Sequence, residues 1–302
     1  MMDDLKLWLG PMRVDFLYLD VACVFLATSA AVWTHGKINI WYLILAFVGA
    51  VCAHVSVNSL NEYFDFKSGL DLLSERTPFS GGSGTLRDRP DMAPIALGIA
   101  VVGLTITALI GLYFLFVRGW RILPLGALGI SVIVVYTHWI TRQPLVSLIV
   151  TGLGFGLLMV MGTYYVLTGE YTWTAFFASL APFFLGNDLL LLNQFPDVEA
   201  DQAVGRRNLP ILIGRQASSY IYGLLLLATY LSTVTGVWLG YLPATTLLGL
   251  LTLPLAVVAT IGVYRHACDL PKLVRHMGFN VLLNITTPML IALGFPIARA
   301  LA

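Results

Sequence analysis

Two groups of carboxylate and amide side chains interrupt an otherwise apolar chain of 302 residues. Each group follows a long apolar run, where ionised side chains are costly and usually serve an ion, a proton or a charged substrate. Oxygen donors of this kind suit a hard divalent cation whose coordination is completed by phosphate, and Mg²⁺ bridging a diphosphate fits them best. The candidate residues are Asn61, Asp65, Asp71, Asn193, Asp197 and Asp201.

The spacing within each group indicates a shared helix face. Four residues separate Asn61 from Asp65, and the same step relates the three members of the second group. Asp71 falls off that face, but Ser68 and Gly69 are expected to break the helix and bring it back. Both groups lie at helix C-termini, the negative ends of the helix dipoles, so cationic partners are expected. Nearby basic residues are Lys67, Arg76, Arg206 and Arg207.

The composition indicates an integral membrane protein. Hydrophobic residues make up 58% of the chain and charged residues 11%, against about 25% charged in soluble domains. We predict one domain, residues 1–302, that is all-α: a polytopic membrane bundle with about nine transmembrane helices and a central cavity opening to the cytoplasmic side. The nine apolar stretches lie near residues 14–34, 40–61, 93–117, 121–139, 145–167, 172–194, 217–238, 242–264 and 278–298.

The positive charges predict the orientation of these spans. With nine spans, 13 of the 17 lysines and arginines fall on the side of the N-terminus and 4 on the other. Cytoplasmic loops are enriched in basic residues, so we place the N-terminus and both acidic groups in the cytoplasm. No removable signal peptide is expected. The three scattered cysteines are interpreted as packing residues.

Two acidic motifs at these positions resemble those of the UbiA-type intramembrane prenyltransferases, which bind a prenyl diphosphate through Mg²⁺. The resemblance covers most of the chain, since nine spans with motifs after the second and sixth are the layout of that family. Asn61-x3-Asp65-x5-Asp71, with Gly69, is more similar to the 1,4-dihydroxy-2-naphthoate (menaquinone-pathway) branch than to the 4-hydroxybenzoate branch. The second motif, followed by Gly205-Arg206-Arg207, is also similar to that of the family.

The resemblance implies transfer of a prenyl group from a prenyl diphosphate to a small aromatic acceptor in the cell membrane, with membrane lipid but no nucleic acid as a partner. It implies that the catalytic residues are the metal ligands Asp65, Asp71, Asp197 and Asp201. The residues implied to contact substrate are Asn61, Lys67, Arg76, Tyr136, Arg142, Asn193, Arg206 and Arg207.

Two departures from the family pattern leave the acceptor open. A second arginine expected after Arg76-Thr77 is missing, although the amides of the Ser80-Gly81-Gly82 turn could bind phosphate instead. The connection that holds Tyr136 and Arg142 lacks an acidic residue that menaquinone-branch members often carry. Other acceptors of the same family are hydroxybenzoates, tocopherol or chlorophyll precursors, haem and glycerol phosphates. An ion-coupled secondary transporter is the alternative from another class.

Five further polar residues have two interpretations each. Asp188 either extends the site or pairs with a neighbouring polar group. Glu62 and Glu199 are expected to face solvent or a basic partner. His54 and His138 could accept a proton from the acceptor ring, but a lone histidine near a helix end is more often structural.

Overall fold

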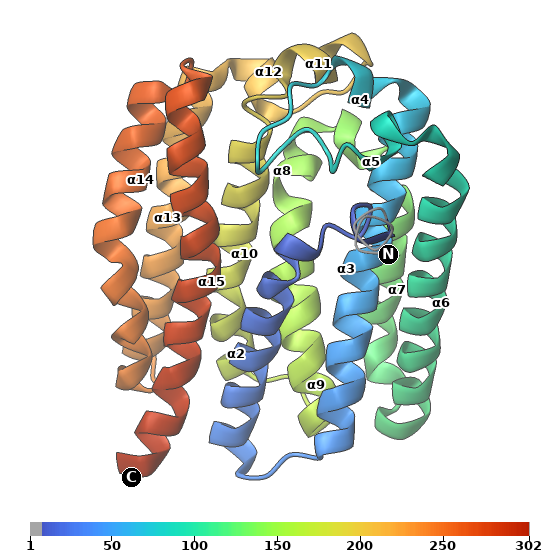
Figure 1. The fold of residues 1–302 in the computed structure, drawn as a ribbon. Coiled ribbons are helices and arrows are strands. Elements are labelled where there is room, and N and C mark those ends of the chain that lie inside the picture. The colour runs from blue at the N-terminus through green and yellow to red at the C-terminus, as the bar shows by residue number, and fades with distance from the viewer. Residues whose placement is uncertain (1–7, 302) are drawn as a thin grey trace.

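The computed structural model describes residues 8–301, and the helices in that range form one bundle without strands. The long helices run side by side (Figure 1). Eight of them are long and apolar enough to cross a membrane: Val14–His35, Ile40–Ser68, Pro90–Arg118, Pro144–Thr168, Trp173–Asn193, Arg215–Trp238, Ala244–His266 and Leu270–Leu301.

A ninth apolar segment, Trp120–Val135, is shorter. It comprises η3 (Trp120–Ile122) and α7 (Leu123–Val135), and it ends four residues before the end of the predicted fourth span, 121–139. The prediction of an all-helical membrane bundle is therefore confirmed, with eight full-length spans and one short one in the described part of the chain. Two helices run well past their predicted limits, α3 to Ser68 and α15 from Leu270, because helices continue into the aqueous face where hydropathy no longer marks them.

The long segments carry local irregularities, and short helices connect them. The long helices are α2 (Tyr18–His35), α3 (Ile40–Ser68), α6 (Ala93–Arg118), α10 (Trp173–Asn193), α13 (Arg215–Trp238), α14 (Leu253–His266) and α15 (Leu270–Leu301). One span combines α8 (Pro144–Gly152), the π-helix η5 (Leu153–Met161) and α9 (Gly162–Thr168). The others are η1 (Val14–Phe16), α4 (Leu70–Leu73), α5 (Thr85–Asp88), η2 (Pro90–Met92), η4 (Ile140–Arg142), α11 (Val198–Ala203), α12 (Leu209–Ile213) and η6 (Ala244–Thr252).

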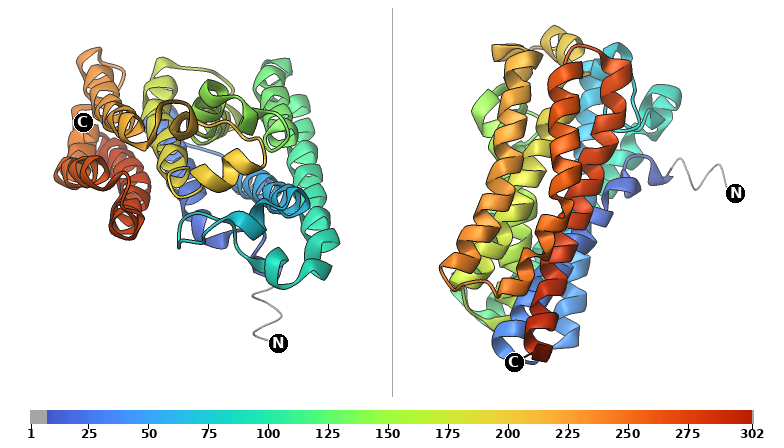
Figure 2. Two further views of the ribbon diagram at one scale, coloured as in Figure 1. Left: turned by 90° about the horizontal axis from the view of Figure 1, so that it is seen from above. Right: turned by 90° about the vertical axis from the view of Figure 1, so that its left-hand side faces the viewer.

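The two ends of the bundle differ. The short helices α4, α5, α11 and α12 cover one end, which also holds both acidic motifs (Figures 1 and 2). Four exposed tryptophans lie at the opposite ends of their helices: Trp41, Trp120, Trp173 and Trp238. Tryptophan is enriched where a membrane meets water, so these residues mark one interface and place the motifs near the other.

Helix α10 is the central element, packing against α2, α8, η5, α13 and α15. Small residues allow α8 and η5 to cross it closely. A side chain at Gly152 would meet the Phe183 carbonyl, and one at Gly156 would meet the Ser179 carbonyl. The Gly152 amide also donates to Asn187 Oδ1 at 2.6 Å. Close crossings of this kind hold membrane helices together, since water exclusion does not drive their association.

The chain turns at the end of each motif helix for a different reason. Gly69 adopts a left-handed conformation (φ 77°) that ends α3 and directs Asp71 back, as predicted. The prediction of one helix face from Asn193 to Asp201 is wrong, because α10 ends at Asn193 and a new helix begins at Val198. Pro196 lies in this break, and proline cannot donate the amide hydrogen bond that a helix interior needs.

Candidate active site

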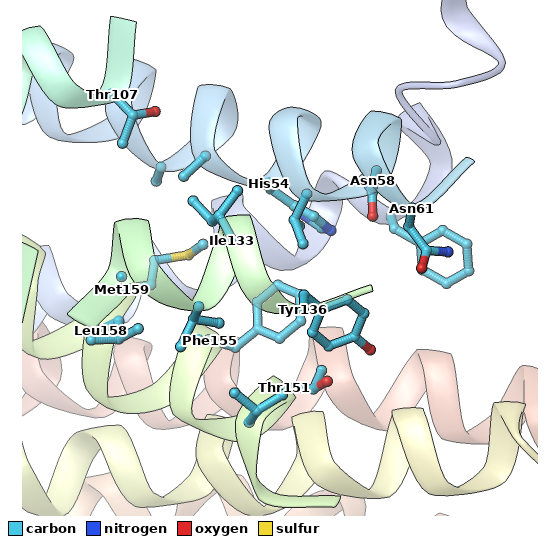
Figure 3. A pocket seen from close by; sticks show the side chains of 18 of the residues that line it. His54, Asn58, Asn61, Thr107, Ile133, Tyr136, Thr151, Phe155, Leu158 and Met159 are labelled. Carbon is cyan, nitrogen blue, oxygen red and sulfur yellow. The ribbon is translucent and has the colours of Figure 1, made fainter. Parts of the chain in front are cut away.

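A single cavity of about 700 Å³ connects the motif end of the bundle with its apolar interior. Figure 3 shows part of its wall, where His54, Asn58 and Asn61 follow one another along α3 and face Tyr136, Phe155 and Thr151. Eight of the twelve predicted site residues line this cavity: Asn61, Asp65, Asp71, Tyr136, Asn193, Asp197, Asp201 and Arg206. The fold therefore brings the two sequence motifs together.

The first motif is held rigidly at the end of α3. Asn61 donates through Nδ2 to Asp65 Oδ2 at 2.8 Å, and its Oδ1 accepts from Thr137 Oγ1 at 3.3 Å. Asn61 and Asp65 thus share a face of α3 as predicted, and a connection from the opposite wall fixes the orientation of the amide. Asp65 is only 5% exposed, and it lines the cavity.

Asp71 lies beneath a glycine turn. Ser80, Gly81 and Gly82 line the cavity, and a Cβ added at Gly82 would lie 3.3 Å from Asp71 Oδ1. Both glycines have positive φ (79° and 70°), which a side chain would strain. Burial, together with the carboxylates of Glu62 and Asp65, raises the pKa of Asp71 to about 7.

The second motif contributes two carboxylates from the break after α10 and from α11. Asp197 and Asp201 both line the cavity with Asn193. Asn208 donates through Nδ2 to Asp201 Oδ2 at 2.8 Å. Burial, followed by the neighbouring Asp201 carboxylate, raises the pKa of Asp197 to about 7, and burial also raises the pKa of Asp201.

Arg206 joins the two motifs. Its Nη2 makes a short contact with Asp65 Oδ1, and its Nη1 lies 3.3 Å from Asp201 Oδ1. The guanidinium thus occupies the space between carboxylates from α3 and from α11. A planar group with several donors can exchange such carboxylate partners for phosphate oxygens without losing its charge-assisted bonds.

A second buried ion pair ties the N-terminal segment to the site, and the sequence did not reveal it. Arg13 Nη2 lies 2.8 Å from Glu62 Oε1, which also accepts from the Ser83 amide at 2.6 Å. Glu62 is 1% exposed, so it faces the basic partner that was one of its two predicted environments and does not face solvent. Glu199 is exposed and pairs with Arg215 at 2.6 Å.

The other four predicted residues are basic side chains outside the main cavity. Lys67 and Arg142 line a smaller pocket of about 240 Å³ on the outer side of Asp65, together with His138. Arg76 and Arg207 are exposed and line neither pocket; Arg76 Nη2 makes a short contact with the Ser83 carbonyl, and the Arg207 amide donates to the Thr141 carbonyl at 3.2 Å. Their roles toward substrate stay predictions.

The deeper part of the cavity is apolar and reaches the side of the bundle. Gly111 and Gly126 line it, and a Cβ added at either meets nothing within 4 Å. Leu112 and Leu123 also line it while being 47% and 54% exposed. These leucines belong to spans that face lipid, so the cavity opens laterally between α6 and α7.

The sequence profile of the UbiA prenyltransferase family matches residues 21–275. The chain belongs to this family. It is therefore a prenyltransferase, and membership favours the enzyme over the ion-coupled transporter that the intramembrane acids left open.

Three relatives of this UbiA-family chain have names that indicate different reactions. A 1,4-dihydroxy-2-naphthoate octaprenyltransferase of Mycobacterium leprae is 27% identical, with 90% of each chain covered. A 2-carboxy-1,4-naphthoquinone phytyltransferase of Synechocystis is 24% identical over 96% of this chain and 93% of the relative. A digeranylgeranylglyceryl phosphate synthase of Thermococcus kodakarensis is 26% identical over 66% of this chain and 68% of the relative.

Solved structures of UbiA homologues share the fold. The apo structure of one from Aeropyrum pernix has a TM-score of 0.68 at 16% identity, covering 95% of this chain and 99% of that one. A homologue from Archaeoglobus fulgidus, bound to DMAPP and Mg²⁺, has a TM-score of 0.59 at 14% identity, covering 94% and 98%.

The donor atoms that line this cavity suit a divalent cation. Asp71 Oδ2 and Asp197 Oδ1 are buried without a hydrogen-bond partner, so each carries a free lone pair. Across residues 8–301, no three His, Cys, Asp or Glu side chains form a ready metal cage. Mg²⁺ commonly binds through one or two carboxylates plus substrate phosphates, which agrees with two opposed motifs that need a ligand between them.

Several residues of this site were not predicted from the sequence. Asn58 could have been found, since it lies three residues before Asn61 on the same face of α3. Asn208 follows the arginines of the second motif closely. Arg13 gave no signal, because its partner Glu62 is 49 residues away and only the folded chain brings them together.

Proposed function

We propose that this protein catalyses Mg²⁺-dependent transfer of a prenyl group from a prenyl diphosphate to an aromatic acceptor of the 1,4-dihydroxy-2-naphthoate type. One observation carries the proposal: carboxylates of two motifs, 132 residues apart at Asp65 and Asp197, meet at the polar end of one long apolar cavity. A prenyl diphosphate has the same division, with a charged head and an apolar tail.

The residues at the polar end are suited to hold a diphosphate as it leaves. Asp65, Asp71, Asp197 and Asp201 would hold the metal, and Arg206 would turn from the carboxylates to phosphate oxygens. Asn61 and the amides of the Ser80–Gly82 turn would orient the head group. Bound Mg²⁺ supplies positive charge that stabilises the diphosphate as its bond to the allylic carbon breaks. The apolar walls keep water from that carbon, and aromatic faces stabilise positive charge on it.

The naphthoate acceptor is supported by the first motif and by the names of two relatives. The phosphate-bearing acceptor suggested by the Thermococcus relative is the competing candidate. Incubating the purified protein with Mg²⁺, a series of prenyl diphosphates and both acceptor types tests this directly. The expected product is a prenylated naphthoate identified by mass. Adduct formation with the glycerol phosphate acceptor alone would reject the naphthoate assignment.

We also propose that the motif end faces the cytoplasm, as the basic residues indicate. A native probe is available, since Cys268 is exposed at the α14–α15 turn on that end, whereas Cys23 is buried. A membrane-impermeant thiol reagent should label Cys268 in inverted vesicles but not in intact cells. Labelling of intact cells would reverse the orientation, and a Cys268→Ser variant controls for the other thiols.

A further inference from the structure

A buried carboxylate–imidazole pair lies deeper in the cavity wall than the diphosphate site. His54 Nδ1 on α3 lies 2.9 Å from Asp20 Oδ1 and 3.1 Å from Asp20 Oδ2 on α2. Asp20 is 0% exposed and His54 is 9% exposed. His54 lines the cavity, whereas Asp20 lies behind it. The histidine therefore has a buried acidic partner, which the sequence did not indicate.

The geometry leaves one ring nitrogen of His54 free. Both contacts with Asp20 involve Nδ1, which assigns the proton of the neutral ring to that atom and leaves the lone pair on Nε2. Phe155 packs edge-on against the ring at 5.1 Å between centroids. A carboxylate that fixes the tautomer and offsets the charge of an imidazolium is the arrangement that makes histidine an effective base.

The depth of His54 suits the acceptor and not the diphosphate. On α3, His54, Asn58, Asn61 and Asp65 follow one another at three- or four-residue steps and all line the cavity. At 1.5 Å per residue, His54 lies about 16 Å below Asp65. A diphosphate spans about one helical turn and is bonded directly to the first prenyl carbon, so a head group held by the motifs places that carbon near the level of Asn61 and Asn58. An acceptor ring that packs beneath this carbon reaches the level of His54. Tyr136 and Phe155 face that level from the other wall (Figure 3).

We propose that His54 is the general base that takes a proton from the hydroxyl of the aromatic acceptor, with Asp20 as its positioning residue. This inference rests on the proposed function. The bond from prenyl C1 to oxygen breaks, and its electron pair leaves with the diphosphate. The ring carbon next to the hydroxyl bonds to C1, while the hydroxyl proton passes to Nε2 and the hydroxyl becomes a carbonyl.

The second half of the reaction returns the proton to the acceptor. When the substituted ring carbon carries a carboxylate, its bond to that group breaks and carbon dioxide leaves. The electron pair restores the aromatic ring, and the oxygen recovers the proton from the imidazolium. Throughout, Asp20 keeps the imidazolium paired in surroundings where an isolated charge is strongly disfavoured.

A series of acceptors with increasingly acidic hydroxyls distinguishes a base from a structural contact between α2 and α3. The probes are 1,4-dihydroxy-2-naphthoate and its fluorinated derivatives, assayed with wild type, His54→Gln and Asp20→Asn. For His54→Gln we expect kcat for adduct formation to fall roughly 10²-fold or more with the parent acceptor. The loss should shrink steadily as the hydroxyl becomes more acidic, because an ionised acceptor needs no base. The KM for the prenyl diphosphate should stay unchanged.

Asp20→Asn should give a smaller loss, about tenfold, with the same dependence on acceptor acidity. His35→Gln, an exposed histidine at the other end of the bundle that pairs with Glu170, is the matched control and should match wild type. Unchanged kcat in His54→Gln, or an equal loss with every acceptor, overturns the role of His54 alone. Absence of any naphthoate adduct from wild type would instead overturn the proposed function. If His54→Gln does not fold, His54→Asn and Asp20→Asn carry the same test.

Discussion

The part of the chain that forms the cavity and the part that does not are packed in different ways. Cavity-lining side chains come from residues 13–208, the cavity region, and none comes from residues 209–301, the C-terminal region. In the most apolar stretches of α3 and of the span Pro90–Arg118, 22% and 17% of residues are buried, whereas the three spans of the C-terminal region have 39%, 39% and 44%. The inner spans of the cavity region, Val14–His35 and Trp173–Asn193, are packed more tightly, at 56% and 67%. The loosely packed helices of the cavity region, α3 and the span Pro90–Arg118, therefore leave room for a ligand, and the C-terminal helices fill their space with side chains.

The buried polar groups of the two regions also differ, because those of the cavity region are charged and those of the C-terminal region are mostly neutral. In the cavity region, buried carboxylates face one another and share cationic partners such as Arg206 and Arg13. In the C-terminal region, buried polar groups form short neutral hydrogen bonds, for example Tyr230 with Thr252 at 2.9 Å. Charge is thus concentrated where a charged ligand is expected. The buried hydroxyls and amides of the C-terminal region carry no charge, and two of their atoms, Ser218 Oγ and Asn280 Nδ2, have no hydrogen-bond partner.

Asp188 provides the strongest test of this difference, because it is a buried acid of α10 that does not line the cavity. Asp197→Asn should lower the rate of transfer by about 10²–10³-fold, since it removes a carboxylate proposed to hold the Mg²⁺ that stabilises the leaving diphosphate. Asp188→Asn should keep nearly full activity and equal or greater thermal stability, because both oxygens of Asp188 lack hydrogen-bond partners. Assays of both variants under saturating substrate, with melting curves, provide the comparison.

A comparable loss of activity in Asp188→Asn would break the distinction. It would show that the catalytic region extends into the packed side of α10, which is one of the two environments predicted from sequence. The structure places Asp188 away from the cavity, near Tyr222 and Tyr230, without a polar group bonded to it.

A bulky side chain in the empty part of the cavity should give the next largest effect. Gly126→Phe should lower kcat/KM for long prenyl diphosphates by about tenfold or more and leave DMAPP transfer almost unchanged, because it fills space used only by a long tail. Gly98→Phe is the matched control, since Gly98 also has no atom within 4 Å of an added Cβ but does not line the cavity. Equal effects of the two variants would argue that the tail lies elsewhere.

The smallest expected effect is a dependence of stability on pH in the cavity region. The pKa values of Asp71 and Asp197 are raised to about 7, so the folded chain holds protons that the unfolded chain loses near pH 4. The free energy of unfolding should therefore fall as pH rises from about 4 to 7 and level off above that. Melting temperatures of metal-free protein at pH 5 and pH 8 measure this.

Asp197→Asn should weaken that dependence, and Mg²⁺ with inorganic diphosphate should restore stability at pH 8, since both remove the repulsion between ionised carboxylates. Asp15→Asn, an exposed residue outside the cavity, is the control and should leave the slope unchanged. A melting temperature that rises from pH 5 to pH 8 would contradict the assignment.

The sequence predicted the helices of both regions, but only part of the local geometry of the cavity region. The apolar runs predicted the spans of both, because long hydrophobic segments must form helices in a membrane. Four-residue spacing predicted the contact of Asn61 with Asp65, and Gly69 predicted the turn to Asp71, since both depend on local geometry. The break at Pro196 was missed, because the regular spacing of the acids was given more weight than the proline.

Contacts between distant residues could not be predicted from one sequence. Arg13 with Glu62, Asp20 with His54 and Arg206 with Asp65 join residues separated by 49, 34 and 141 positions. Neither periodicity nor composition specifies which polar groups on different helices will meet. The same limit applies to Lys67, which was predicted from its closeness to Asp65, and to Arg142, which was predicted from the resemblance: neither lines the main cavity.

The lateral opening beside Leu112 and Leu123 has a consequence for enzymology. A long-chain substrate that enters from the bilayer is at a concentration set by its ratio to lipid or detergent, and the volume of buffer hardly matters. Apparent Michaelis constants for such a substrate should scale with the amount of detergent, and alkyl chains of the detergent should compete for the same groove. Rates measured in micelles therefore need to be expressed per mole fraction of substrate before different chain lengths are ranked.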